Sequence, residues 1–183
     1  FTYFQTSATI DGQPLLEAEV MSGTATLAEI SGNAKAVDDP LPAGTPIPEA
    51  WLAWKPAHLR FATTIVAEDP AAGRLVTGYH YGKDHPFVPG HFPGGPLMMG
   101  VTQWAAIADA AWAARCRFGL TGTIIANGVM KRPDGREVMD VRDLELADDG
   151  GVPRIASTKR IAFRDKVVPG ESVLVEVTVS ARS

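Results

Sequence analysis

Residues 85–101 read HPFVPGHFPGGPLMMGV, and they lead directly into a long run of small and apolar residues. The prolines and glycines between Asp84 and Pro96 predict a loop. From Leu97 to Phe118 the residues are almost wholly small or apolar, and Gly119 follows as a stop signal. We therefore expect one long helix that is buried on most sides rather than lying amphipathically on a surface.

Strand-like segments flank this helix in the sequence. They are rich in β-branched residues and are separated by turn signals such as residues 133–135 (PDG) and 148–151 (DDGG). The predicted strands are Leu59–Val66, Arg74–Tyr81, Gly122–Met130, Glu137–Leu146, Arg154–Phe163 and Ser172–Ala181. Together they predict an α+β fold in which an antiparallel sheet wraps around one long buried central helix.

The first thirty residues predict a β-hairpin. Residues 1–10 are rich in aromatic and β-branched residues, Asp11-Gly12 is a strong two-residue turn signal, and Gln13–Leu27 is the predicted returning strand. A hairpin alone is marginally stable, so we expect it to pair with further strands. The proline-rich stretch Gly32–Glu49 is predicted to be a semi-rigid linker that forms neither a strand ladder nor a helix.

Composition narrows the function classes. The chain has 183 residues with a formal net charge of -4, which argues against a nucleic-acid binder that relies on a basic surface. Its one cysteine, Cys116, can form neither an internal disulfide nor a zinc site, so a reducing cytoplasm is the expected compartment. No signal peptide is visible, and Asp109 within Leu97–Ala114 favours a soluble core helix over a membrane span.

Two stretches together resemble a known family. In the loop and the helix start, the matching residues are His91, Phe92, Pro93, Gly94, Pro96, Met98, Gly100 and Val101. About seventy residues later, Phe163–Glu171 reads FRDKVVPGE. Both stretches, in this order, resemble the signatures of the hot-dog-fold β-hydroxyacyl-(acyl-carrier-protein) dehydratases of fatty-acid synthesis. The resemblance implies a hot-dog fold.

The resemblance also implies a reaction. His91 would remove the α-proton of a 3-hydroxyacyl thioester, and the β-hydroxyl would leave as water, giving a 2-enoyl thioester. An imidazole suits a base at neutral pH, and free backbone N–H groups at Gly100 can polarise the thioester carbonyl. The substrate would be carried on phosphopantetheine or coenzyme A, with no other cofactor and no metal. The implied substrate-binding residues are Phe92, Gly94, Pro96, Met98, Val101 and Gln103.

The chain departs from the family pattern at one decisive position. The family's catalytic helix acid falls on Ala105, which cannot transfer a proton. Asp109 lies four residues on and therefore on the same helix face, so it is the candidate replacement acid. Gln103 can orient a water but cannot serve as an acid, and Met99 replaces the family's proline before Gly100.

Several alternatives follow from this departure. Family active sites form between two hot-dog units, so a homodimer or tandem hot-dog partner is expected and can supply the missing acid. Acyl carrier protein or acyl-CoA is the other expected partner, and neither nucleic acid nor membrane is expected. The unit can instead be a non-catalytic acyl-binding or structural partner of an active dehydratase, or an acyl thioesterase.

The order of the segments is unusual for the family. The expected domains are a hairpin at 1–31, a linker at 32–50 and a dehydratase-like hot-dog at 51–183. The hairpin resembles the last hairpin of single-domain members, so it either completes a permuted sheet beside Ser172–Ala181 or ends a preceding hot-dog of a multidomain synthase.

Further residues carry weaker expectations. His85 either flanks the pocket or forms hydrogen bonds within the loop, and the second is favoured. The main basic groups either receive an acidic carrier protein or a phosphate, or form a solvated face. They are Lys131, Arg132, Arg136, Lys159, Arg160, Arg164 and Lys166.

Overall fold

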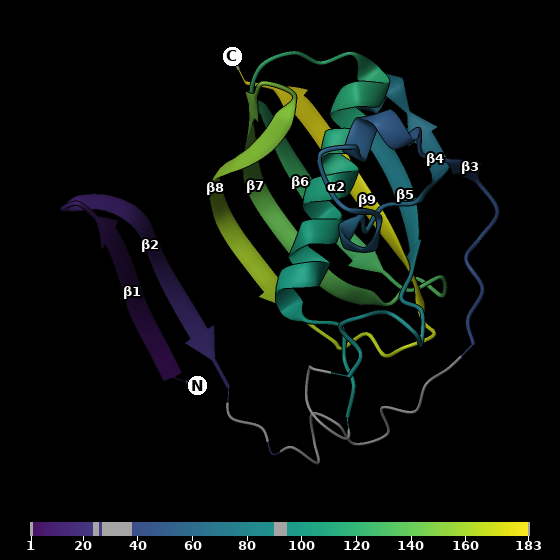
Figure 1. Cartoon of the computed structure of the whole chain (residues 1–183), viewed down its shortest axis with the longest axis horizontal. Coiled ribbons are helices and arrows are strands. Elements are labelled where there is room, and N and C mark those ends of the chain that lie inside the picture. Colours follow the sequence, from purple (N-terminus) through teal and green to yellow (C-terminus); the bar gives the residue numbers. More distant parts are fainter. Residues whose placement is uncertain (1, 24–25, 27–37, 90–94, 183) are drawn as a thin grey trace. The chain divides into compact units, whose positions relative to one another are not determined.

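The computed structural model describes residues 2–23, 26, 38–89 and 95–182 (Figure 1). The chain divides into two compact units, Phe1–Asn33 and Ala34–Ser183.

The first unit is the predicted hairpin. β1 (Thr2–Ile10) pairs antiparallel with β2 (Gln13–Ser22) as a two-stranded sheet. Asp11 and Gly12 connect the strands with φ angles of 49° and 74°, as the two-residue hairpin turn requires. The returning strand is shorter than predicted, because β2 ends at Ser22 and Leu27 lies outside the described residues.

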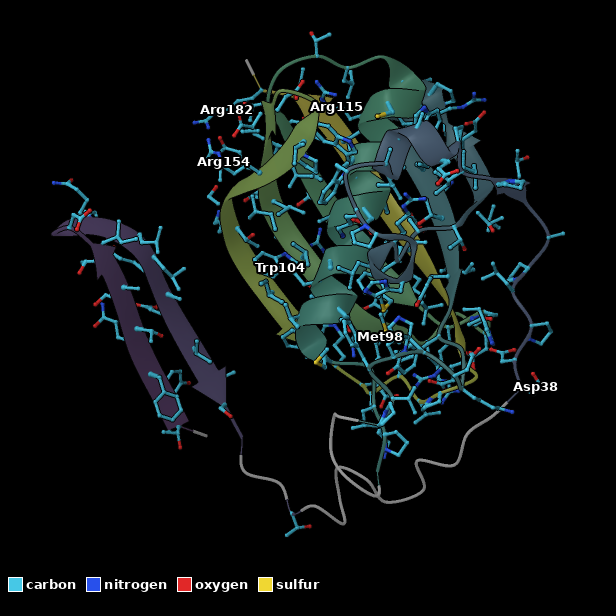
Figure 2. The ribbon with its side chains drawn as sticks, in the orientation of Figure 1. Asp38, Met98, Trp104, Arg115, Arg154 and Arg182 are labelled. Carbon is cyan, nitrogen blue, oxygen red and sulfur yellow. The ribbon has the colours of Figure 1, made fainter. Side chains whose placement is uncertain are left out.

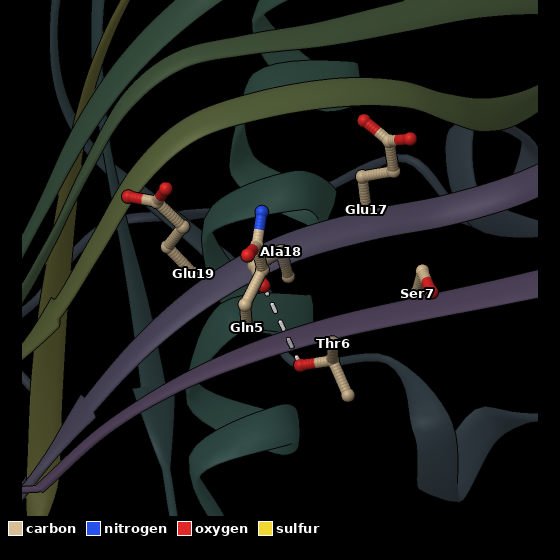
Figure 3. A pocket seen from close by; sticks show the side chains of 6 residues that line it. All are labelled: Gln5, Thr6, Ser7, Glu17, Ala18 and Glu19. Carbon is tan, nitrogen blue, oxygen red and sulfur yellow. Dashed lines mark hydrogen bonds between the residues drawn. The ribbon is translucent and has the colours of Figure 1, made fainter.

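The two faces of the hairpin differ in polarity. The pairing places Gln5 opposite Glu19 and Ser7 opposite Glu17, so these polar side chains share one face (Figure 3). The Thr6 hydroxyl donates a long hydrogen bond of 3.5 Å to the carbonyl oxygen of Ala18 across the two strands. The other face is apolar, and its exposed large side chains are Phe4, Leu16 and Val20.

The second unit contains a seven-stranded antiparallel sheet in the order β3-β4-β5-β9-β6-β7-β8 (Figure 1). Its strands are β3 (Thr45–Pro46), β4 (Thr64–Asp69), β5 (Arg74–His80), β6 (Ile124–Lys131), β7 (Glu137–Asp149), β8 (Val152–Phe163) and β9 (Ser172–Ala181). Short 3-10 helices are η1 (Glu49–Leu52), η2 (Ala57–Leu59) and η3 (Pro70–Ala72).

The long helix α2 (Gly100–Phe118) packs against this sheet, contacting β5, β6, β7 and β9. It begins three residues later than predicted, and Gly119 ends it with a φ of 66°, a left-handed conformation that glycine adopts easily. The expected α+β architecture is confirmed at this level, with one buried helix on a large antiparallel sheet. No helix in the described residues has both the length and the apolar character needed to cross a bilayer.

The proline-rich stretch corrects one prediction. Thr45 and Pro46 pair with Ile65 and Thr64, so the stretch does contribute two residues to a strand ladder. Pro46 is tolerated because β3 is the edge of the sheet, where a missing N–H removes no necessary bond. Gly44 permits the close approach, because a Cβ there would lie 2.3 Å from the Ile65 carbonyl oxygen.

β9 lies inside the sheet rather than at its edge. Both edges of β9 are occupied along the strand, one by β5 and the other by β6. Counting the described residues alone, the edge strands of the seven-stranded sheet are β3 and β8.

Candidate functional site

The two family-like stretches of sequence meet at the N-terminal end of α2. The Met98 N–H donates a hydrogen bond of 2.8 Å to the carbonyl oxygen of Val167. The ring of Phe163 lies against Gly100, where an added Cβ would come within 2.8 Å of the ring. Figure 2 labels Met98 at this end of the helix. Residues from both stretches thus form one local structure.

Three of the predicted site residues lie outside the described residues. They are His91, Phe92 and Gly94. The roles predicted for them stay predictions. Among the described candidates, Met98 and Gln103 are buried, Pro96 and Gly100 are partly buried, and the Val101 side chain is 60% exposed.

The start of α2 leaves backbone donors available. Met99 precedes the helix without a side-chain cap, and its carbonyl oxygen accepts from the N–H groups of Thr102 and Gln103. Within the described part of the chain, the N–H groups of Gly100 and Val101 have no acceptor. The helix dipole adds partial positive charge there, so this end of the helix can bind and polarise a carbonyl oxygen.

Gln103 supports this end of the helix from inside. Its Nε2 donates to the carbonyl oxygen of Met98 at 3.3 Å, and its Oε1 is buried without a partner in the described structure. Ala105, where the family carries its acid, packs partly buried against the core. The first two turns of α2 therefore hold no proton donor other than hydroxyl, indole and amide groups.

Asp109 is buried and has two partners. Lys55 Nζ lies 2.6 Å from Oδ1, and the Phe61 backbone N–H donates to Oδ2 at 2.9 Å. Burial raises the pKa of the Asp109 carboxyl above its ordinary value, while Lys55 and the Phe61 N–H act in the opposite direction. These contacts attach the Lys55–Phe61 segment to the helix, which favours a structural role for Asp109.

His85 is a hydrogen-bonded loop residue. The Phe87 N–H donates to Nδ1 at 3.2 Å, so the proton belongs on Nε2, which lies 3.1 Å from the carbonyl oxygen of His58. The ring also lies 5.2 Å from the Tyr81 ring and 6.1 Å from the Phe61 ring, measured between centroids. The favoured prediction of loop hydrogen bonding is confirmed, and His85 fixes the segment that leads toward His91.

Arg132 is the buried anchor of the Phe163–Glu171 stretch. Its guanidinium contacts Asp165 at 2.8 Å and Glu171 at 3.0 Å, and it also donates to the Lys166 carbonyl oxygen at 2.5 Å. Because these donors are used inside the fold, Arg132 is not available to a carrier protein. In the described residues, no three His, Cys, Asp or Glu side chains are grouped closely enough to hold a metal ion.

Sequence reasoning missed Lys55 and Phe61, the two partners of Asp109. Lys55 is 54 residues away from Asp109, and no local pattern connects the two. Phe61 contributes its backbone N–H, which carries no residue-type signal at all.

A comparison with known protein families adds no assignment, because no family model matches this chain.

Proposed function

We propose that this chain binds 3-hydroxyacyl thioesters and dehydrates them to 2-enoyl thioesters in a hot-dog-like domain. The observation that carries the proposal is the meeting of residues 96–101 with Phe163–Glu171 at the start of α2, where the Gly100 and Val101 N–H groups have no acceptor in the described structure. A thioester carbonyl is a suitable acceptor for these donors. Charge that develops on its oxygen during α-proton removal is stabilised by them.

The remaining groups divide into a base and an acid. His91 takes the α-proton, and the hydroxyl leaves as water after it receives a proton from a carboxylic acid. Ala105 is no acid, and Asp109 is committed to Lys55 and the Phe61 N–H. We therefore expect the acid to come from a second unit, as the family resemblance implies. The substrate is carried on acyl carrier protein or coenzyme A.

A second candidate function is supported by the contacts of Asp109. If no second unit supplies an acid, the same helix end binds acyl thioesters without turnover. The chain is then the non-catalytic partner of an active dehydratase.

The test measures hydration of crotonyl thioesters and dehydration of 3-hydroxybutyryl thioesters, each linked to coenzyme A and to acyl carrier protein. We expect turnover, and we expect His91→Ala to lower it by about 100-fold or more. His58→Ala is the matched control, because the His58 side chain is exposed. Full activity of His91→Ala would refute the assignment of the base.

Two further measurements separate the alternatives. No turnover by the wild type, together with thioester binding and activity gained by Ala105→Glu, would support the non-catalytic candidate. Release of free thiol from acyl-CoA would indicate a thioesterase instead.

A further inference from the structure

The edge strand β8 exposes apolar side chains on the face of the sheet that elsewhere forms the core. Ile161 lies opposite Val141, and Phe163 lies opposite Met139. The two β7 residues are fully buried, whereas Ile161 is 37% exposed and Phe163 is 56% exposed. Ile155, further along β8, is 40% exposed. Among the described residues only β7 pairs with β8, so the hydrogen-bonding edge on the other side of β8 is free in this part of the chain.

The opposite face of β8 is basic. Arg154 and Arg160, which lie opposite Ala147 and Arg142, are on this face, and the strand contains no acidic residue (Figure 2 labels Arg154). In the described structure Arg154 and Arg160 have no carboxylate partner. Arg160 lies directly opposite Arg142, and two like charges in that position destabilise a strand pair. An acidic group beside β8 would relieve this repulsion.

The hairpin has the complementary properties. Residues 1–22 contain Asp11, Glu17 and Glu19 but no lysine or arginine. Glu17 and Glu19 share the polar face, and neither has a cationic partner in the described structure (Figure 3). The apolar face leaves Phe4 53% exposed and Leu16 54% exposed. A two-stranded ribbon with an uncovered apolar face needs a further partner to be stable.

We propose that the hairpin of a second copy of this chain adds to the free edge of β8. In this arrangement the apolar face of the hairpin continues the apolar face of β8. Glu17 and Glu19 then lie on the side of Arg154 and Arg160. Backbone hydrogen bonds along the shared edge supply affinity, and the paired faces supply specificity.

A symmetric pairing of β8 with β8 is disfavoured. It would bring Arg154, Lys159 and Arg160 of one copy against the same residues of the other, without an acid on either strand. Exchange of hairpins avoids this repulsion, and when two copies exchange hairpins reciprocally the assembly closes as a two-fold dimer. This inference does not depend on the proposed function.

The test uses the full chain and its mass in solution over a range of concentrations. We expect a dimer with twice the 19.5 kDa mass of one chain. Glu17→Lys with Glu19→Lys, and separately Arg154→Glu with Arg160→Glu, should each weaken dimerisation at least about tenfold. The matched controls reverse exposed charges elsewhere and should leave the dimer intact: Asp38→Lys with Asp84→Lys, and Lys83→Glu with Arg136→Glu.

Mixing the two weakened variants tests whether the hairpin of one copy is what binds to β8 of the other copy. The lysine-bearing hairpin of one variant then meets the glutamate-bearing β8 of the other, and the two native surfaces meet in the same complex. Restored dimerisation on mixing is the expected result. A monomer at every concentration, a dimer that the charge reversals do not weaken, or variants that remain monomeric when mixed would each overturn the proposal. Circular dichroism of each variant checks that it folds.

Discussion

The Asp109 carboxyl shows how one buried residue makes stability depend on pH. Burial raises its pKa in the folded chain above the ordinary value of 3.8. The folded state therefore holds this proton more tightly than the unfolded state does. The stability contributed by Asp109 is fully present below pH 3.8 and is lost as the pH rises through the raised pKa.

Asp109→Asn should remove this dependence. We expect the wild type to lose stability, relative to the variant, as the pH rises from about 4. Urea unfolding of both proteins between pH 4 and pH 8 measures the difference. Asp38→Asn is the control, because Asp38 is exposed. Parallel curves for wild type and Asp109→Asn would contradict the prediction.

The type of a residue predicts whether its side chain can transfer a proton, but it does not predict which distant groups the side chain contacts. Ala105 identifies the missing acid without any structure, because its side chain has no proton to transfer. Spacing also placed Asp109 on the same helix face, but it did not indicate that Lys55 and the Phe61 N–H occupy its oxygens. Their positions depend on how the segment before β4 folds back over α2.

At the scale of elements, α2 and β6 are in contact through Gly128. A Cβ at Gly128 would lie 2.4 Å from Cγ2 of Ile107, and Ile107 is fully buried. The absence of a side chain at Gly128 thus sets how closely the helix approaches the sheet.

Gly128→Ala should lower the free energy of unfolding by about 1–3 kcal/mol, because the overpacked side chain has no free space to enter. Denaturant unfolding measures the loss. Ile107→Ala removes the clashing methyl group, so the double variant should lose less than the sum of the two single variants. Strictly additive losses would show that Gly128 and Ile107 do not limit the packing.

Most elements were predictable from local pattern. The strand predicted at Ser172–Ala181 has the predicted bounds, and the long helix is confirmed with a start at Gly100. The segment predicted as a strand from Leu59 instead contains the end of η2, and β4 begins at Thr64. Its residue types suit a strand, but the Phe61 N–H bonds to Asp109 rather than to a neighbouring strand.

At the scale of the whole molecule, burial differs sharply between the hairpin and the sheet. In β9, Val173, Val175 and Val177 are fully buried and both edges of the strand are paired. In the hairpin, every described side chain of β1 is exposed. Local opening therefore costs far less free energy in β1 than in β9.

Amide hydrogen exchange should reveal this difference in the cost of local opening. At concentrations where the chain is monomeric, we expect the amides of β1 and β2 to exchange orders of magnitude faster than those of β9. Mass spectrometry of peptides from each strand measures the rates. Equal protection of hairpin and β9 in the monomer would contradict the prediction.

Residue types and their spacing predicted most of the elements, the hairpin turn at Asp11-Gly12, the order of the two family-like stretches and the absence of an acid at position 105. These depend on residue type and on periodicity over a few residues. The assembled fold alone shows that β9 lies between β5 and β6, that β8 is an edge strand of the described sheet, and that Asp109 pairs with Lys55. Such contacts join residues far apart in the chain, and their energy exists only once the sheet and helix have assembled.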